Sequence, residues 1–366
     1  MINIEHLLDI SKKLIISGSL ENGAIVAANA MMKHYPPEAK NYFYVWPRDA
    51  SYACIAADII GIERIQENFF DWCLERAEGF NKTGLFFEKY YVNGLKAAFR
   101  FQPDQTASVL YAIWHHYREN IEKSRRFEDL IEKAANGLCS KWRADHFEII
   151  TNDLWEERLT FPDIHDNFTY SLAACIRGLE CSNEMMPNDN WLSVAQQMRR
   201  RLDQHFVGEH FVRSFGDLID DKIDASMLGL VYPFGIYSAN DPRIISTVND
   251  IENKLARDGG VHRYEFDKYD GWFYEGVHRN KGAGAWPLLN FWLSIYYCLK
   301  ANITNEKDDR DNAKKYYDWV FSNLKEGEVY LPEQIFKNNL QKSISPLLWS
   351  HAMFILATEY LKNIEN

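Results

Sequence analysis

Two runs of this chain place carboxylates beside aromatic or proline residues. The first is Asp153-Leu154-Trp155-Glu156-Glu157, and the second is Leu331-Pro332-Glu333-Gln334. Hydrolysis of a glycosidic bond uses two carboxyl groups: one protonates the leaving oxygen, and the other acts on the opposite face of the sugar. Runs so far apart in the sequence meet only in a fold that gathers many loops at one rim.

Apolar periodicity predicts about twelve helices with no linker between them. The apolar pattern and the start and stop signals place these helices at Ile4–Ser17, Asp49–Ile60, Glu63–Glu78, Asp104–Arg118, Phe127–Asp145, Asn167–Leu179, Trp191–His205, Asp224–Val231, Pro242–Arg257, Pro287–Lys300, Asp308–Leu324 and Pro346–Leu361.

The predicted helices alternate between two kinds. The odd-numbered ones carry one apolar stripe and a charged face, which is typical of a helix with one side in water. The even-numbered ones are apolar nearly all round, which indicates burial on all sides. Six helices of each kind predict an all-α (α/α)6 barrel, with residues 1–366 forming a single domain. A helical solenoid is the alternative, but it requires a repeating sequence period, and none is found.

Residues that can do chemistry precede the even-numbered helices. Trp46-Pro47-Arg48-Asp49 opens the second helix, Gln102-Pro103-Asp104-Gln105 opens the fourth, and the first carboxylate run leads to the sixth. Trp286-Pro287 and Ser345-Pro346 begin the tenth and the twelfth. Proline and aspartate are also ordinary helix start signals. In a barrel, however, these helix ends face one mouth, which predicts a site there.

Composition argues against several classes of partner. The net charge of −11, without a basic cluster, disfavours nucleic acid and anionic membranes. No apolar run approaches the ~18 residues of a membrane span, and the N-terminus lacks the regions of a secretory signal. The six cysteines are scattered without metal-ligand spacing, which favours buried thiols in a reducing cytoplasm.

Seven motifs, in the same order along the chain, resemble those of glycoside hydrolase family 15, the glucoamylase-type exo-α-glucosidases. Besides the two carboxylate runs, they are Gly23-Ala24-Ile25-Val26-Ala27, Tyr42-Phe43-Tyr44-Val45-Trp46-Pro47-Arg48-Asp49, Asp224-Ala225-Ser226-Met227-Leu228-Gly229-Leu230, Gly259-Gly260-Val261-His262-Arg263-Tyr264 and Pro346-Leu347-Leu348-Trp349-Ser350-His351-Ala352. The resemblance extends from about Gly23 to the C-terminus. The (α/α)6 barrel that it implies agrees with the helix count.

The resemblance implies that Glu156 is the general acid and Glu333 the general base of an inverting hydrolase. The two carboxyls of such an enzyme stand roughly 6.5–9.5 Å apart, which leaves room for a water molecule. Two structural alternatives stay open at this point. Glu156 pairs with Arg158 on the surface, or Glu333 caps a helix.

The resemblance also implies which residues bind the sugar. Arg48 and Asp49 correspond to the pair that grips the terminal glucose at a closed pocket end, which gives exo action; alternatively, Asp49 only caps its helix. Tyr42 and Trp46 resemble the aromatic walls around that glucose. The remaining implied contacts are Trp155 at the next subsite, Glu157 on a hydroxyl of the leaving sugar, and Arg263 as a further substrate-binding arginine.

Some positions leave alternatives open. Gln102, Asp104, Trp286 and Trp349 either contact substrate or serve the core. The segments Gly271–Asn280 and Phe161–Asp166 depart from the family pattern and are expected near the leaving-sugar subsites, so the residues do not fix the linkage. No N-terminal β-sandwich and no starch-binding module are expected.

We therefore predict a soluble, cytoplasmic, inverting exo-α-glucosidase that releases β-glucose from short α-1,4-linked gluco-oligosaccharides. The alternatives within the family are an isomaltose-type α-1,6 glucohydrolase and a trehalase. A metal-dependent cyclase on the same barrel would need a Cys/His ligand set, and a non-catalytic sugar-binding protein would not need both Glu156 and Glu333. No cofactor or metal is expected, and the only expected partner is the oligosaccharide.

Overall fold

A computed structural model describes residues 3–33, 35–272, 281–338 and 340–365. Its α-helices are α1 (Ile4–Gly18), α2 (Pro47–Ile59), α3 (Ile65–Glu75), α4 (Phe80–Thr83), α5 (Pro103–Tyr117), α6 (Glu128–Lys141), α7 (Thr169–Met185), α8 (Asp189–Leu202), α9 (Pro242–Leu255), α10 (Pro287–Thr304), α11 (Lys307–Asn323) and α12 (Leu348–Glu365). The described residues also form the 3₁₀ helices η1 (Ile121–Phe127), η2 (Pro162–Ile164), η3 (Asp203–His205) and η4 (Ala225–Leu230).

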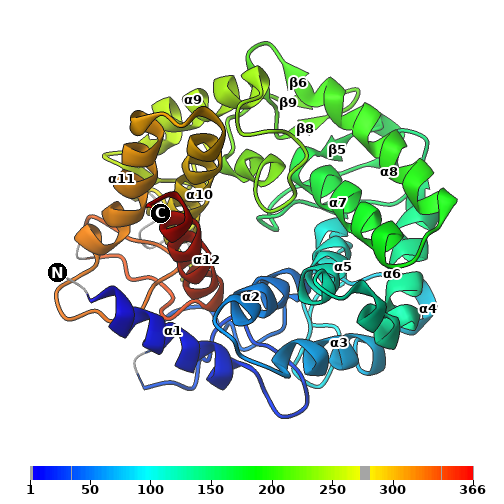
Figure 1. Ribbon diagram of the computed structural model, residues 1–366, viewed down its shortest axis with the longest axis horizontal. Helices are drawn as coiled ribbons and strands as arrows, with labels where there is room; N and C mark the ends of the chain where they lie inside the picture. The colour runs from blue at the N-terminus through cyan, green and yellow to red at the C-terminus, as the bar shows by residue number, and fades with distance from the viewer. Residues whose placement is uncertain (1–2, 34, 273–280, 339, 366) are drawn as a thin grey trace.

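The helices form two concentric rings, as Figure 1 shows. In the inner ring α2 packs on α5, α5 on α7, α7 on η4, η4 on α10, α10 on α12, and α12 again on α2. The outer ring consists of α1, α3, α6, α8, α9 and α11. The predicted (α/α)6 barrel is confirmed.

Side-chain character decides which ring a helix joins. Helix α2 is buried from Pro47 through Ala57, and small residues such as Ala53 let its neighbours approach closely. Helix α9 instead buries one stripe, Ile244, Val248, Ile251 and Leu255, at helical spacing. The alternation between these two kinds of sequence is therefore the alternation between the rings.

The eighth predicted helix, Asp224–Val231, is wrong in type. Its residues form only the short 3₁₀ helix η4, which Asp224 caps by accepting the backbone N–H of Ser226. Pro233 follows closely, lacks an N–H donor, and disfavours helical backbone at the residue before it. The segment still occupies the inner ring between α7 and α10.

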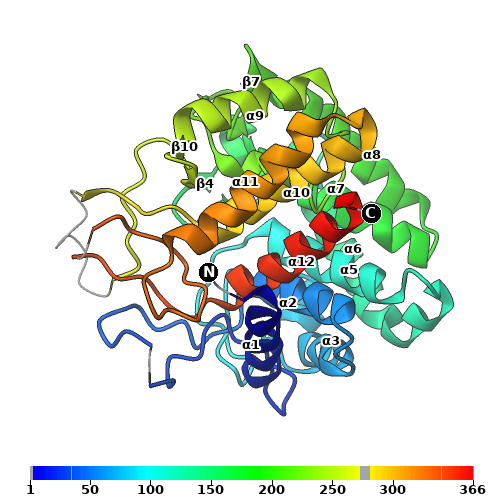
Figure 2. The same ribbon diagram turned by 60° about the vertical axis from the view of Figure 1, so that its left-hand side comes forward.

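Short antiparallel strands shape the connections between helices. The strands are β1 (Trp142–Arg143), β2 (His146–Phe147), β3 (Thr151–Asn152), β4 (Leu159–Thr160), β5 (Asn167–Phe168), β6 (Phe206–Val207), β7 (His210–Phe211), β8 (Ser214–Phe215), β9 (Ile219–Asp220), β10 (Ala256–Arg257) and β11 (Gly260–Val261). The pairs are β1–β2, β3–β4, β6–β7 and β10–β11, and β8 lies between β5 and β9. Figure 2 shows long loops gathered at one end of the helices.

The two ends of the chain meet where the ring closes. Helix α1 packs on the outside of α12, and His351 of α12 lies wholly buried between them. Its Nε2 accepts the backbone N–H of Leu331 at 2.9 Å, so Nδ1 carries the proton that is donated to Ser11 Oγ of α1 at 2.8 Å. His351 thus joins the first helix, the last helix and the loop that holds Glu333.

Within the described part of the chain, no helix is both long and apolar enough to cross a lipid bilayer.

Candidate active site

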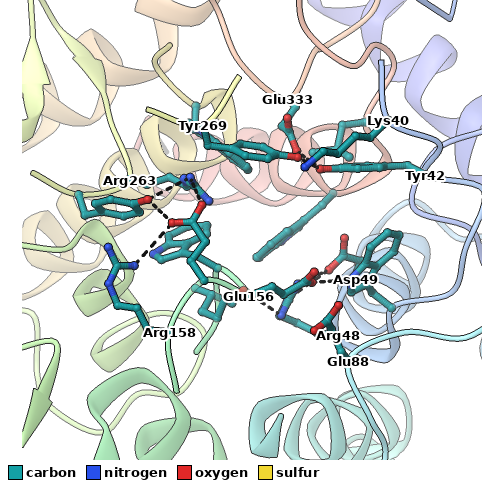
Figure 3. A pocket seen from close by; sticks show the side chains of 18 of the residues that line it. Lys40, Tyr42, Arg48, Asp49, Glu88, Glu156, Arg158, Arg263, Tyr269 and Glu333 are labelled. Atoms are coloured by element: carbon teal, nitrogen blue, oxygen red, sulfur yellow. Dashed lines mark hydrogen bonds and ion pairs between the residues drawn. The ribbon is translucent and has the colours of Figure 1, made fainter. Parts of the chain in front are cut away.

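One cavity of about 680 Å³ lies where the N-terminal ends of the inner helices meet. Figure 3 shows that its side chains come from loops and helix starts that lie far apart in the sequence. All nine residues that the sequence proposes for the site line this cavity: Tyr42, Trp46, Arg48, Asp49, Trp155, Glu156, Glu157, Arg263 and Glu333. Their individual roles remain predictions.

A tight turn between β3 and β4 presents Glu156. Asp153 organises the turn, because its Oδ1 accepts the backbone N–H groups of Glu157 at 2.7 Å and Arg158 at 3.0 Å. Glu156 itself has a left-handed φ of 63°. Such backbone is costly for a non-glycine residue and persists only where its surroundings hold it.

The Glu156 carboxyl lies between an indole and two cations. Trp46 donates its indole N–H to Oε1, Arg48 Nη2 lies 3.9 Å from Oε1, and Lys89 Nζ lies 3.7 Å from Oε2. Burial, together with the nearby Glu88 carboxylate, raises the pKa of Glu156 to about 8. A carboxyl that keeps its proton near neutral pH is suited to act as a general acid.

The surface pairing of Glu156 with Arg158 is not what the structure shows. Arg158 extends its guanidinium to Asp153 at 3.4 Å, Glu157 at 3.7 Å and Asp220 at 3.8 Å. Glu156 turns into the cavity instead.

Glu333 lies in an extended segment before α12, where its backbone N–H donates to Ile344 O at 2.8 Å. Its carboxylate accepts the Tyr42 hydroxyl at 2.9 Å and the Gln334 amide at 3.4 Å, rather than a helix N-terminus. Burial raises the pKa of Glu333 to about 7, although the bond from Tyr42 opposes the rise. Figure 3 shows Glu333 and Glu156 on opposite sides of the cavity.

Arg48 and Asp49 form the buried floor at the start of α2. The Arg48 guanidinium contacts the Asp49 carboxylate at 3.1 Å, the Asp104 carboxylate at 3.2 Å and the carbonyl of Leu154 at 3.3 Å. It also stacks over Trp349, 5.0 Å from the ring centroid. Asp49 stands in the first turn of α2, so it is placed both to stabilise the helix start and to face the cavity.

Arg263 is more deeply engaged with protein than the sequence suggests. It is 2% exposed, and its guanidinium donates to Asp267 at 2.7 Å and to Glu157 at 2.8 Å. Tyr264 donates its hydroxyl to the other oxygen of Glu157. Arg263 therefore fixes the orientation of Glu157 in addition to any contact with substrate.

The four positions with open alternatives divide into two pairs. Trp286 and Trp349 line the cavity. Gln102 and Asp104 lie behind it: Gln102 donates to the carbonyl of Asp153, and Asp104 pairs with Arg48. This second pair braces residues of the site without lining it.

Sequence reasoning missed several lining residues, among them Tyr269, Glu88 and Lys89. Tyr269 shares a hydrogen bond with Tyr42, and Glu88 and Lys89 lie beside Glu156. No spacing rule connects Glu88 or Lys89 to the carboxylate runs. The one signal in the sequence is that aromatic residues, among them Phe87 and Tyr90, flank the charged pair on both sides, as they do in many sugar-binding surfaces.

The segments that depart from the family pattern contribute little to the described cavity. Phe161–Asp166 contains η2, and none of its residues lines the cavity. In the other segment, Gly271 has a φ of +73° and lies so close to Glu333 that a Cβ there would come within 3.0 Å of Oε2. Residues 273–280 of that segment lie outside the described residues.

Among the described residues, side chains of the types that bind metals cluster at Asp145, His146 and His165, outside the cavity. The Nδ1 atoms of His146 and His165 lie 2.8 and 3.4 Å from the two oxygens of Asp145. The two rings stack at 4.1 Å with an angle of 21° between them. Nearly parallel rings do not direct both nitrogens at one ion, so this cluster fits a hydrogen-bonded carboxylate better than the converging ligands of a zinc site.

Comparison with known proteins agrees with this geometry. The family described as "Glycosyl hydrolases family 15" matches residues 5–359. An uncharacterised glycosyl hydrolase of Methanocaldococcus jannaschii is 33% identical over 92% of this chain and 52% of its own length, so the chain spans about half of that relative. The isomaltose glucohydrolase of Kribbella flavida is 23% identical over 87% of this chain and 84% of its own length.

A solved glycosidase structure has the same fold. It has a TM-score of 0.76 at 21% identity and covers 98% of this chain and 97% of its own. The family match, the sequence relatives and this shared fold all point to the same family. The chain belongs to glycosyl hydrolases family 15, a family of glycosidases.

Proposed function

We propose that this protein is an exo-acting α-glucosidase that hydrolyses short gluco-oligosaccharides with inversion and releases β-glucose. The observation that carries the proposal is the pair Glu156 and Glu333. Loops far apart in the sequence bring these two carboxyls to one cavity, and each has its own hydrogen-bond partner there.

The two carboxyls divide the chemistry. Glu156, protonated, gives its proton to the glycosidic oxygen as the bond from that oxygen to C1 breaks. Glu333, ionised, takes a proton from a water molecule whose oxygen attacks C1 from the opposite face. Because the water attacks from the face opposite the leaving oxygen, an α-linked glucose departs as the β-anomer. One proton leaves Glu156 and one arrives at Glu333, so the protons balance.

The floor of the cavity supports exo action. Arg48 is held rigidly by Asp49 and Asp104, and its fork of donors beside the Asp49 acceptor suits two adjacent hydroxyls of a terminal glucose. Trp46 and Tyr42, whose ring centroids are 5.3 Å apart, supply apolar walls for the sugar ring. Because this floor closes the cavity, the cavity suits the terminal glucose of a chain and not a glucose in its middle.

We propose the α-1,4 linkage first, with short maltose-type sugars as substrates. A specific observation favours the α-1,6 alternative: the relative from Kribbella flavida, an isomaltose glucohydrolase, matches over 84% of its length. We further propose that the protein acts in the cytoplasm, which suits five buried cysteines and one half-buried cysteine.

The test is glucose release from maltose, maltotriose, isomaltose and trehalose, with proton NMR used to identify the first anomer. Glu156→Gln and Glu333→Gln should each lose at least about 100-fold in kcat, because each removes a proton-transfer group. Glu119→Gln, an exposed residue at a distance from the cavity, is the matched control and should behave as wild type. Initial release of α-glucose, or full activity in either site variant, would overturn the proposal.

A further inference from the structure

Glu88 and Lys89, in the loop between α4 and α5, reach the acid from one side of the cavity. Lys89 Nζ lies 3.1 Å from Glu88 Oε1 and 3.7 Å from Glu156 Oε2, so one ammonium stands between two carboxyl groups. The same ammonium lies 4.9 Å from the centroid of the Trp46 ring, whose N–H bonds Glu156. Figure 3 shows Glu88 beside Arg48, below Glu156.

The position of Glu88 is fixed by the hairpin that carries the acid. Its second oxygen accepts the side-chain amide of Asn152, a wholly buried residue of β3, at 2.9 Å. The backbones of the two segments are tied together as well: Glu88 N–H donates to Arg100 O at 3.1 Å, and Asn152 N–H donates to Phe101 O at 2.8 Å. Glu88 therefore cannot move away from Glu156 without disrupting the base of that turn.

These contacts give the carboxyls of Glu88 and Glu156 different surroundings. Both oxygens of Glu88 face donors, the Asn152 amide and the Lys89 ammonium, and such donors stabilise an ionised carboxylate. Within the described part of the chain, the one close donor to Glu156 is the Trp46 indole at Oε1, and the two cations stand farther away, at 3.7 and 3.9 Å. A fixed negative charge at Glu88 then opposes ionisation of Glu156.

Other charged or titratable groups of the described residues near Glu156 also enter this balance. Arg48 and Lys89 favour ionisation, and Arg100 contacts only the carbonyl oxygen of Glu156, at 3.4 Å. Glu157 turns its carboxylate to Arg263 and Tyr264. The phenols of Tyr42 and Tyr269 stay neutral because burial raises the pKa of each well above its usual value.

We propose that Glu88 is a positioning residue that keeps the proton on Glu156 before catalysis, while Lys89 stabilises the carboxylate that Glu156 becomes after it has given that proton away. This inference rests on the proposed function and deepens it. Adjacent residues of one loop would then act on the same proton in opposite directions.

The opposite signs provide the test, which is the pH dependence of kcat/KM for the best substrate. Glu88→Gln removes the negative charge and should move the alkaline limb, where Glu156 loses its proton, to lower pH by about one unit or more. Lys89→Met removes the positive charge and should move the same limb to higher pH. The acidic limb, where Glu333 ionises, should stay in place in both variants.

Glu88→Asp is the conservative control, because it keeps the charge and should leave the alkaline limb near its wild-type position. A purely structural role for the two residues would lower kcat at every pH without moving the limbs apart. Limbs that stay in place, or that move in the same direction in both charge variants, would overturn the inference. If Glu88→Gln does not fold, Lys89→Met alone tests the inference: its alkaline limb must move to higher pH, and a limb that stays in place overturns the inference.

A second readout separates this inference from the proposed function. If the wild-type protein cleaves none of the four sugars, the proposed function fails at that step. The titration of Glu156 is then followed by carbon NMR of protein labelled at its glutamate carboxyls, with Glu156→Gln used to assign the signal. A lower midpoint in Glu88→Gln and a higher one in Lys89→Met support the inference without any turnover, and unchanged midpoints overturn it.

Discussion

Glu333 is buried and Glu156 is half-buried, and the two also differ in the groups that face them. Burial raises the pKa of each, to about 8 for Glu156 and about 7 for Glu333. Glu156 has a carboxylate neighbour that opposes its ionisation, whereas Glu333 accepts the hydroxyl of Tyr42, which favours its ionised form. The general acid must keep its proton at a pH at which the general base has lost its own. The higher pKa of Glu156 and the lower pKa of Glu333 meet this requirement.

The pH profile follows from that order. The base must be ionised, so kcat/KM should fall below about pH 7; the acid must be protonated, so it should fall again above about pH 8. We expect a bell-shaped profile with its maximum between these values, measured as initial rates of glucose release in constant ionic strength. A maximum near pH 4.5, the ordinary value for glutamate, would contradict this assignment.

Tyr42 should tune the base. In Tyr42→Phe the hydroxyl bond to Glu333 is lost, and with it a contact that lowers the pKa of the base, so the acidic limb should move to higher pH. A hydrogen bond to a charged group contributes about 1.5–3 kcal/mol, which predicts a loss of roughly tenfold or more in kcat/KM below pH 7. Tyr44→Phe is the matched control because Tyr44 packs on Trp46 outside the cavity lining. An unchanged acidic limb in Tyr42→Phe would refute this role.

The sequence predicted the site residues that lie in recognisable motifs. It did not predict those that reach the site only through tertiary contacts. Glu156 and Glu333 stand in recognisable runs, and the structure places both in one cavity. Glu88 and Lys89 lie in an irregular loop, and their meaning depends on a tertiary contact with Asn152 and the acid. The engagement of Arg263 with Asp267 was equally invisible, because a short sequence spacing does not show where a side chain points.

At the scale of elements, the β3–β4 hairpin is the device that aims the acid. Its turn holds Glu156 in left-handed backbone, and the Asp153 carboxylate satisfies the N–H groups that follow. These hydrogen bonds span only four and five residues, so Asp153 supports the turn from within the hairpin. A residue without contact to substrate should therefore matter strongly for rate.

We expect Asp153→Ala to lower kcat by about 100-fold with little change in KM, because a displacement of about 1 Å at a catalytic group costs this much. Two part-buried hydrogen bonds to a carboxylate are lost, so the free energy of unfolding should fall by about 2 kcal/mol. Steady-state kinetics and urea unfolding measure both effects. Asp163→Ala, in the exposed η2, is the control. An Asp153→Ala enzyme with normal kcat and a raised KM would show that the turn serves binding instead.

Most of the helices were predictable from sequence. A helix buried on one side has a single apolar stripe, and a helix buried on all sides is apolar all round. The two rings follow from that alternation, and Pro47, Pro103 and Pro287 each begin an inner helix. The eighth helix failed because an apolar run of helical appearance precedes Pro233, and tertiary packing holds it as η4. Short strands of two residues carry no readable period at all.

At the scale of the whole molecule, burial favours the neutral form of the wholly buried His205 and His351 and of the half-buried His262. Burial lowers the pKa of His205 and His351 to about 3 and that of His262 to about 4. In the unfolded chain a histidine titrates at about 6.5. Below that pH these histidines bind protons in the unfolded state but not in the folded state. The free energy of unfolding therefore falls as the pH drops from about 6.5.

His351→Gln isolates one of these contributions. At pH 7.5 the variant should be less stable than wild type, because the link between Ser11 and Leu331 is impaired. As the pH falls from about 6 toward 3, the wild-type protein alone should lose about 1.4 kcal/mol per pH unit from this residue, so the gap should close. Urea unfolding at pH 7.5, 6, 5 and 4 measures the gap. Parallel curves would show that His351 is not held neutral.

The closure of the inner ring by α12 against α2 has a consequence for how the protein is made. A nascent chain leaving the ribosome carries the floor and the acid long before the loop with Glu333 and the last helix are synthesised. Until then the apolar flanks of α2 and α10 have no neighbour on the open side, and such surfaces associate with other chains. Ribosome stalling or a late stop codon should therefore yield sticky, inactive fragments that chaperones and proteases remove, rather than a weakened enzyme.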